Sequence, residues 1–154
     1  MSGTEETVAD IMERRVLTVD LNSKATECAR AMSRRGVSSA VVVQAQKALG
    51  IVTERDLVSK VMAEGVDASK VLVRDIMSTP LITVLPEATM TKAAEVMAEY
   101  RIRRLVIVDG GGNLVGILTA GDIARTLAEK RGYREPTFNA IARYKEGAER
   151  GPYQ

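Results

Sequence analysis

The sequence of this chain contains two copies of one pattern. The segment VADIM at residues 8–12 returns as VRDIM at 73–77, and GIVTERD at 50–56 returns as GILTAGD at 116–122. The offset is 65 residues for the first motif and 66 for the second. A repeat of this length is a whole supersecondary unit, and two such units bury their apolar faces most simply against each other. The repeat therefore predicts a symmetric binding module with two similar clefts.

Composition limits what such a module can do. The chain has 154 residues, is 45% hydrophobic and 27% charged, and carries a net charge of +2, which argues against a dedicated nucleic-acid binder. Its single cysteine, Cys28, cannot form an intrachain disulfide, so we expect a reducing, cytoplasmic compartment. The sequence has no histidine, which excludes histidine-based triads and zinc sites, so we expect neither catalytic residues nor a metal. No segment has the apolar length of a membrane span, and the N-terminus does not resemble a signal peptide.

Each repeat reads as a short apolar turn, a strand, a helix, two further strands and a closing helix. In the first repeat, residues 25, 28, 29 and 32 form the apolar face of a helix that ends at Gly36, and residues 40–43 form a buried strand. A turn over 44–49 leads to a strand at 50–52. We expect a helix over 53–64 with four side chains inward: Leu57, Val58, Val61 and Met62. Met32, Met62 and Met97 are predicted core residues.

The second repeat copies the first. Pro86 and Glu87 are expected to open a helix whose apolar face holds residues 90, 93, 94 and 97. Strands follow at 105–108 and 114–118, joined by a glycine-rich turn whose spacing matches no phosphate-binding loop. The closing helix covers 119–131. The predicted organisation is an N-terminal extension (1–7), repeat 1 (8–64), a linker (65–72), repeat 2 (73–131) and a tail (132–154).

The tail departs from the repeat and holds most of the aromatic side chains. Tyr133, Phe138, Tyr144 and Tyr153 lie there, and Pro136 could start a short helix. Two interpretations stay open: the tail packs on its own module, or it makes a contact with a partner or a second copy.

The motif Thr-x-x-Asp follows a predicted strand in both repeats, at Thr53/Asp56 and Thr119/Asp122. One interpretation is helix capping, because a threonine N-cap with an acid three residues later forms a capping box. The other is ligand binding: a carboxylate repels phosphate but accepts hydrogen bonds from a diol such as the ribose hydroxyls. A phosphate would then need its own cation, for which Arg103 and Arg104 are candidates, unless they are a solvated strand edge.

These motifs, in this order and in two copies, resemble a tandem pair of cystathionine-β-synthase (CBS) domains over roughly residues 8–131. The resemblance implies an α+β fold of two β-α-β-β-α repeats, packed through their sheets with pseudo-twofold symmetry, whose two clefts bind AMP, ADP, ATP or S-adenosylmethionine. Carried over by position, one nucleotide site uses Leu17, Val37, Ser38, Thr53 and Asp56, and the other uses Pro80, Ile82, Ile102, Arg103, Thr119 and Asp122. Arg104 serves one of the two clefts. The first repeat has Ser38 and Ser39 where the second has Arg103 and Arg104, so we expect the two sites to differ.

The function expected from the resemblance is a regulatory, non-enzymatic sensor that binds an adenine nucleotide, AMP before ADP or ATP, and signals to an unknown regulated protein. The resemblance also implies a homodimer and requires no cofactor. Two alternatives stay open: a sensor of S-adenosylmethionine, methylthioadenosine or NAD, and a nucleic-acid-associated interaction protein. The near-neutral charge makes nucleic acid the weaker partner, and no membrane contact is expected.

Overall fold

The computed structural model describes residues 5–130 and has a mixed α/β fold with two three-stranded sheets. The chain forms two compact units. We call residues 15–82 and 111–114 the first-sheet unit, and the described residues 5–14, 83–110 and 115–130 the second-sheet unit. The predicted tail and residue 131, with which repeat 2 was expected to end, lie outside the described residues, as do residues 1–4 of the N-terminal extension.

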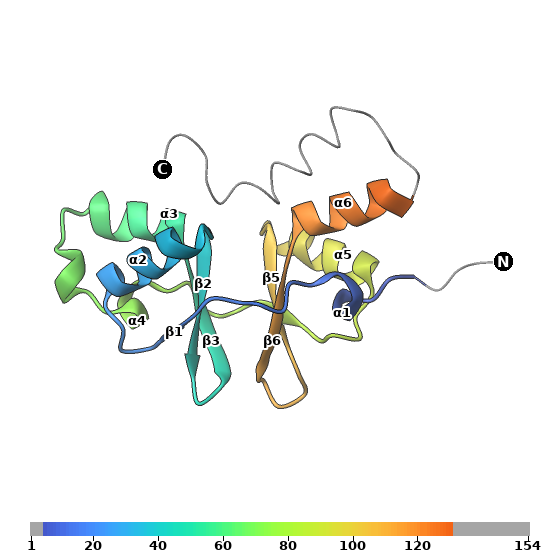
Figure 1. The fold of residues 1–154 in the computed structure, drawn as a ribbon, viewed down its shortest axis with the longest axis horizontal. Helices are drawn as coiled ribbons and strands as arrows, with labels where there is room; N and C mark the ends of the chain where they lie inside the picture. Colours follow the sequence, from blue (N-terminus) through green and yellow to red (C-terminus); the bar gives the residue numbers. More distant parts are fainter. Residues whose placement is uncertain (1–4, 131–154) are drawn as a thin grey trace. The chain divides into compact units, whose positions relative to one another are not determined.

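The first-sheet unit is built on strands in the order β1-β2-β3. β1 (Thr18–Asp20) runs parallel to β2 (Ser39–Gln44), and β2 pairs antiparallel with β3 (Lys47–Thr53). The parallel pair is joined by α2 (Ala25–Arg35), and β3 leads into α3 (Glu54–Leu57). A π-helical segment η1 (Val58–Met62), a 3-10 turn η2 (Ala68–Lys70) and α4 (Val73–Ile76) complete the unit. In Figure 1 its helices lie to one side of β2 and β3.

The second-sheet unit repeats this plan with strands in the order β4-β5-β6. β4 (Thr83–Val84) runs parallel to β5 (Arg104–Val108), with α5 (Met90–Tyr100) between them. β6 (Leu114–Thr119) leads directly into α6 (Ala120–Lys130), as β3 leads into α3. The short helix α1 (Val8–Ile11) belongs to this unit. No helix within residues 5–130 has both the length and the apolar character needed to cross a bilayer.

The two compact units do not coincide with the two sequence repeats, because the leading helical turns are exchanged. The amide of Val8, in the first copy of the repeat, donates to the carbonyl of Ala88 (2.8 Å) in the second-sheet unit. The amide of Val73, in the second copy, donates to the carbonyl of Ser23 (2.7 Å) in the first-sheet unit. Both valines are fully buried. Each core is therefore closed by the leading turn of the other repeat.

The predicted helical faces form most of the core. Ala25, Cys28 and Met32 are buried on α2, and burial raises the pKa of the Cys28 thiol to about 11. The helix ends at Gly36, whose φ of 63° is the left-handed C-cap conformation that the sequence predicted. The central strand is buried from residue 40 to residue 42, as expected, whereas residue 43, which was also expected to be buried, is half-buried.

The start of α5 corrects one sequence expectation. The helix begins at Met90 rather than at Pro86 and Glu87, because the Thr89 hydroxyl caps it by accepting the amide of Lys92 (3.0 Å). A threonine cap satisfies an amide that proline could not. The buried face consists of Met90, Ala93, Val96 and Met97, so Val96 replaces the predicted Ala94.

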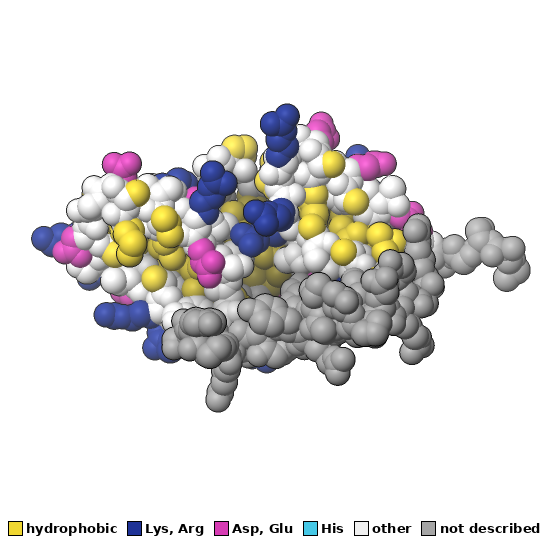
Figure 2. Space-filling view, turned by 90° about the horizontal axis from the view of Figure 1, so that it is seen from above, with side chains coloured by type: hydrophobic (Ala, Val, Ile, Leu, Met, Phe, Trp, Pro, Cys, Tyr) yellow, Lys and Arg dark blue, Asp and Glu magenta, His cyan; other side chains and the backbone are white. Residues whose placement is uncertain are grey.

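The helix after β3 corrects a second expectation. Val58 and Met62 were expected to point inward, but their side chains are 58% and 78% exposed. The reason is the π-helical segment, in which the amide of Ala63 bonds to the carbonyl of Val58 (2.8 Å). An i→i+5 bond places one more residue in the turn and moves the apolar positions away from the 3.6-residue face. Val61 stays buried, whereas Met62 is a surface residue, like some of the hydrophobic side chains visible in Figure 2.

The turn between β2 and β3 is shorter than the predicted 44–49 turn. It consists of Ala45 and Gln46, both with positive φ (48° and 68°), and β3 already begins at Lys47. Such two-residue turns match the twist of antiparallel strands but favour asparagine and glycine. The glycine-rich segment 110–112 lies between β5 and β6, as the sequence predicted, with Gly112 at a φ of 81°.

Candidate ligand site

The junction of β3 and α3 holds the first Thr-x-x-Asp motif in a capping box. The Thr53 amide and hydroxyl both donate to Oδ2 of Asp56 (2.8 and 3.1 Å), and the Asp56 amide donates back to the Thr53 hydroxyl (3.3 Å). The capping interpretation of the sequence is therefore confirmed. A carboxylate in the first helical turn also interacts favourably with the helix dipole.

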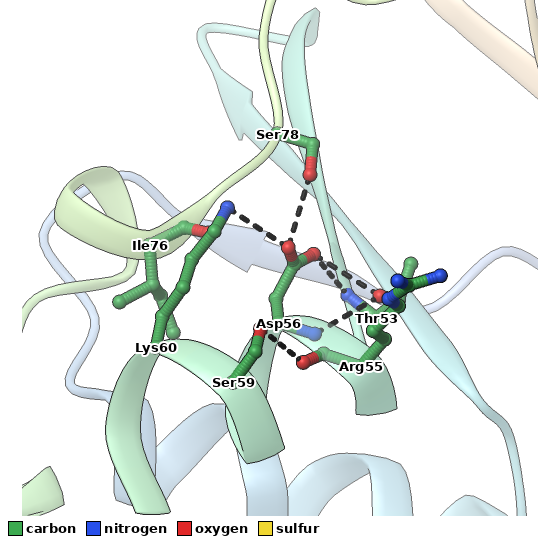
Figure 3. A network of polar contacts seen from close by, with 7 residues as sticks. All are labelled: Thr53, Arg55, Asp56, Ser59, Lys60, Ile76 and Ser78. Atoms are coloured by element: carbon green, nitrogen blue, oxygen red, sulfur yellow. Dashed lines mark hydrogen bonds and ion pairs between the residues drawn. The ribbon is translucent and has the colours of Figure 1, made fainter. Parts of the chain in front are cut away.

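The second carboxylate oxygen of Asp56 is bonded as well. Oδ1 accepts from the ammonium of Lys60 (2.9 Å) and from the hydroxyl of Ser78 (3.0 Å), as Figure 3 shows. Asp56 is only 6% exposed. Its burial raises the pKa of the carboxyl, but the hydrogen bonds from Lys60, Thr53 and Ser78, with the charge of Lys60, outweigh burial and hold that pKa below its usual value. The group is a buried, ionised carboxylate with four hydrogen-bond donors around it.

The second-sheet unit has the same arrangement of threonine and aspartate, but a different cation pairs with the aspartate. The Thr119 amide donates to Oδ2 of Asp122 (2.9 Å), and the Asp122 amide donates to the Thr119 hydroxyl (3.1 Å). Oδ1 of Asp122 pairs with the guanidinium of Arg125 (3.1 Å). Asp122 is again 6% exposed. Among residues 5–130, Asp56 and Asp122 are the charged side chains that the fold buries, one at the same place in each unit.

The start of each helix is also hydrogen-bonded to the residue just before the central strand. The amide of Glu54 donates to the carbonyl of Ser38 (3.0 Å), and that of Ala120 donates to the carbonyl of Arg103 (2.8 Å). The structure thus brings Ser38 beside Thr53 and Asp56, and Arg103 beside Thr119 and Asp122, as the position-by-position expectation grouped them. Ser38 and Arg103 are both exposed, so the two sites have different chemical neighbours at the same location.

The remaining predicted residues are divided between the two units. Leu17 and Val37 are half-buried and pack on the core of the first-sheet unit, where the Leu17 carbonyl accepts the amide of Val41 (2.9 Å). Ile102 and Arg104 are half-buried in the second-sheet unit. Pro80 and Ile82 belong to the first-sheet unit, whereas the other members of their predicted set lie in the second.

Sequence reasoning missed the groups that hold the aspartates. Lys60 lies four residues after Asp56, a spacing at which helical side chains meet, so a signal for this pair was present. Ser78 lies 22 residues away and is brought in by the exchange of backbone hydrogen bonds between Ile51 and Ser78 (3.3 and 2.8 Å). No local sequence pattern predicts the pairing of Ile51 with Ser78.

The glycine that opens the second motif of each repeat lets the segment after a leading helical turn come close to the strand. A Cβ added at Gly50 would lie 2.7 Å from the Met77 sulfur and 3.1 Å from the Ser78 carbonyl oxygen. At Gly116 it would lie 2.5 Å from the Met12 sulfur and 3.1 Å from the Glu13 carbonyl oxygen. The glycine and methionine of the two motifs are therefore packed together in both units.

The two buried carboxylates act as hydrogen-bond acceptors. Across residues 5–130, no three cysteine, aspartate or glutamate side chains come close enough together to hold a metal ion. A buried carboxylate at a helix start, with a hydroxyl beside it, can accept hydrogen bonds from a diol.

Comparison with known proteins identifies the repeat. A family model described as the CBS domain matches residues 8–63 and again residues 73–129. The chain belongs to the CBS-domain family. An uncharacterised protein of Methanopyrus kandleri is 42% identical over 117 residues, covering 75% of this chain and 60% of that protein. A CBS domain-containing protein of Bacillus subtilis is 38% identical over 117 residues, covering 76% of this chain and 82% of the relative.

An inosine-5′-monophosphate dehydrogenase of Korarchaeum cryptofilum is 39% identical over 110 residues. The match covers 71% of this chain but 22% of the dehydrogenase, so the similarity extends to a minor part of that enzyme. The relative from Methanopyrus kandleri is also longer than the part that this chain spans, which is 60% of its length.

Solved structures share the fold of a CBS pair. A CBS domain protein of Pyrobaculum aerophilum, complexed with AMP, has a TM-score of 0.70 and is 27% identical, covering 76% of this chain and 89% of that one. A CBS domain pair in complex with 5′-methylthioadenosine and S-adenosyl-L-methionine has a TM-score of 0.74 and is 26% identical, covering 82% and 99%. The expected CBS fold is therefore confirmed.

Proposed function

We propose that this chain is a regulatory sensor that binds an adenine nucleotide, AMP before ADP or ATP, at Asp56 and Asp122. The observation that carries the proposal is the buried aspartate that recurs at the same strand–helix junction of each unit. Burying a charge is unfavourable unless it is paired, and a helix cap needs no buried acid, since serine, threonine or asparagine can fill that role. Ligand binding explains why the fold keeps two such carboxylates.

The chemistry of the site favours a ribose over a bare phosphate. The carboxylate accepts hydrogen bonds, so a vicinal diol is a suitable partner, while a phosphate would be repelled. The arginine just before β5 is suited to bind the phosphate of a nucleotide, since Arg103 lies beside Thr119 and is exposed. Ser38 stands at the corresponding position of the first-sheet unit, so we propose that the Asp122 site binds phosphate more strongly.

The related structures support an adenosine ligand without selecting one. The protein of Pyrobaculum aerophilum is complexed with AMP, and the other CBS pair holds methylthioadenosine and S-adenosylmethionine. A sensor of those sulfur-containing adenosines is therefore the second candidate for this chain. In either case ligand binding stabilises the bound form by RT ln(1 + [L]/Kd), about 2.7 kcal/mol at a hundredfold excess over Kd. We propose that the ligand-bound form interacts differently with a regulated protein. We further propose that the chain acts as a homodimer and catalyses no reaction of its own.

A thermal-shift panel tests the proposal. The full chain is heated with AMP, ADP, ATP, S-adenosylmethionine, methylthioadenosine and NAD, alongside Asp56→Asn and Asp122→Asn. The control is Asp67→Asn, an exposed aspartate that caps η2 by accepting the Ser69 amide (2.9 Å). We expect AMP to raise the melting temperature of the native chain and of the control, and to raise it less in the two site variants. An equal shift in all four proteins would contradict the site assignment.

A further inference from the structure

We propose that Lys60 is an internal competitor for the ligand at Asp56 and makes that site select against uncharged nucleosides. This inference rests on the proposed function and names the specificity determinant of one of its two sites. It starts from the geometry of Figure 3, in which the Lys60 ammonium is bonded to one oxygen of the Asp56 carboxylate.

The acceptor capacity of Asp56 is fully used within the protein. A carboxylate has about four acceptor positions. Here Oδ2 accepts the Thr53 amide and hydroxyl, and Oδ1 accepts the Lys60 ammonium and the Ser78 hydroxyl. A ribose hydroxyl can therefore bind this aspartate only by displacing one of these four donors.

Lys60 is the charged member of these four donors, so the cost of displacing it depends on the charge of the ligand. The Thr53 amide and hydroxyl belong to the capping box that joins β3 to α3. Ser78 is exposed, so its hydroxyl can rotate away from the carboxylate, but this hydroxyl is neutral and leaves at the same cost for a charged and an uncharged ligand. The Lys60 side chain is 42% exposed, so its ammonium can be hydrated when it leaves the carboxylate.

A second contact keeps the displaced ammonium close to the site. The Lys60 ammonium also donates to the carbonyl of Ile76 (2.9 Å), the last residue of α4, where a positive charge is favoured. A ligand with a phosphate offers this cation a new ion pair in place of the one it loses. An uncharged nucleoside offers none, so it bears the whole cost of breaking the contact with Asp56.

In the described part of the second-sheet unit, a different residue occupies the position of Lys60. The residue that corresponds to Lys60 is Thr126, whose hydroxyl donates to the backbone carbonyl of Asp122 (2.9 Å). The cation on Asp122 is Arg125, one position earlier, and the residue that corresponds to Arg125 is Ser59, which donates to the Arg55 carbonyl (2.7 Å). The two units thus use different helical positions for the cation, and the lysine is particular to the Asp56 site.

Isothermal titration calorimetry of the full chain tests the inference. Adenosine and AMP are titrated into the Asp122→Asn protein, which isolates the Asp56 site, with and without Lys60→Gln. The matched control is Lys70→Gln, which removes the same charge from an exposed lysine on η2. Lys60→Met is a second neutral variant that retains an unbranched side chain.

We expect Lys60→Gln and Lys60→Met to lower the Kd of adenosine by a factor of about 1.5 to 5, the range for a partly exposed ion pair. The Kd of AMP should stay unchanged or rise, so the preference for AMP over adenosine should fall, while Lys70→Gln changes neither. If both ligands change by the same factor, or neither changes, Lys60 does not discriminate and the inference is wrong, although nucleotide binding stands. If the native chain binds neither ligand, the proposed function fails and the inference fails with it.

Discussion

Replacing Gly50 by alanine tests the contact between the glycine of the first repeat and the methionine segment of the second repeat. The added Cβ would lie 2.7 Å from the Met77 sulfur, 3.1 Å from the Met77 Cγ and 3.1 Å from the Ser78 carbonyl oxygen. The methionine side chain can move, but the carbonyl is fixed because Ser78 and Ile51 exchange two backbone hydrogen bonds. The strand and the segment after α4 must therefore separate by a few tenths of an ångström.

The expected cost is that of overpacking a core, about 1–3 kcal/mol of the free energy of unfolding. For a chain of this size each kcal/mol corresponds to a fall in melting temperature of about 2–4 °C. Urea unfolding followed by circular dichroism measures the change directly. The same shift moves Ser78 relative to Asp56, so nucleotide binding at this site should weaken as well.

Two further variants test whether the close contact at Gly50 causes the loss of stability. Gly110→Ala is the control, because a Cβ there meets no atom within 4 Å, and it should change the free energy of unfolding by less than about 0.5 kcal/mol. In a Met77→Ala background, Gly50→Ala should cost less, because the sulfur and Cγ that it strikes are gone. A Gly50→Ala protein as stable as the native chain would refute the packing argument.

Two other predictions concern stability. The pKa of Asp56 lies below its usual value of 3.8, so its ionised form stabilises the fold above about pH 4, and this contribution is lost as the pH falls through the folded-state pKa. The difference in unfolding free energy between the native chain and Asp56→Asn should therefore shrink between pH 5 and pH 2, and a constant difference in urea titrations would contradict it. Replacing Ala45 and Gln46 by asparagine and glycine should stabilise the chain by about 1–2 kcal/mol, because both positions have positive φ, and a fall in melting temperature would exclude that explanation.

Local chemistry explains what the sequence predicted well. The apolar faces of α2 and the buried central strand follow from periodicity, and the end of α2 follows from Gly36. The capping boxes follow from the Thr-x-x-Asp spacing alone. Each of these features depends on residues within a few positions of one another, where one sequence carries the necessary information.

Features that depend on distant contacts were not predictable in the same way. The exchange of the leading turns buries Val8 and Val73 in the unit of the other repeat, and sequence order argued for the opposite assignment. The exposure of Met62 follows from a π-helical turn whose cause lies outside any local pattern. The contact of Ser78 with Asp56, 22 residues away, arises from the backbone bridge between Ile51 and Ser78. In the candidate site, the aspartates could be found from the sequence, whereas most of their partners required the fold.

Titration of the full chain with AMP tests the central claim most directly. Calorimetry should detect binding to the native protein and to Asp67→Asn, with weaker binding to Asp56→Asn and to Asp122→Asn and none to the double variant. Circular dichroism of the double variant would establish that it is folded. AMP binding of undiminished affinity by the folded double variant would contradict the claim that these two buried carboxylates hold the nucleotide.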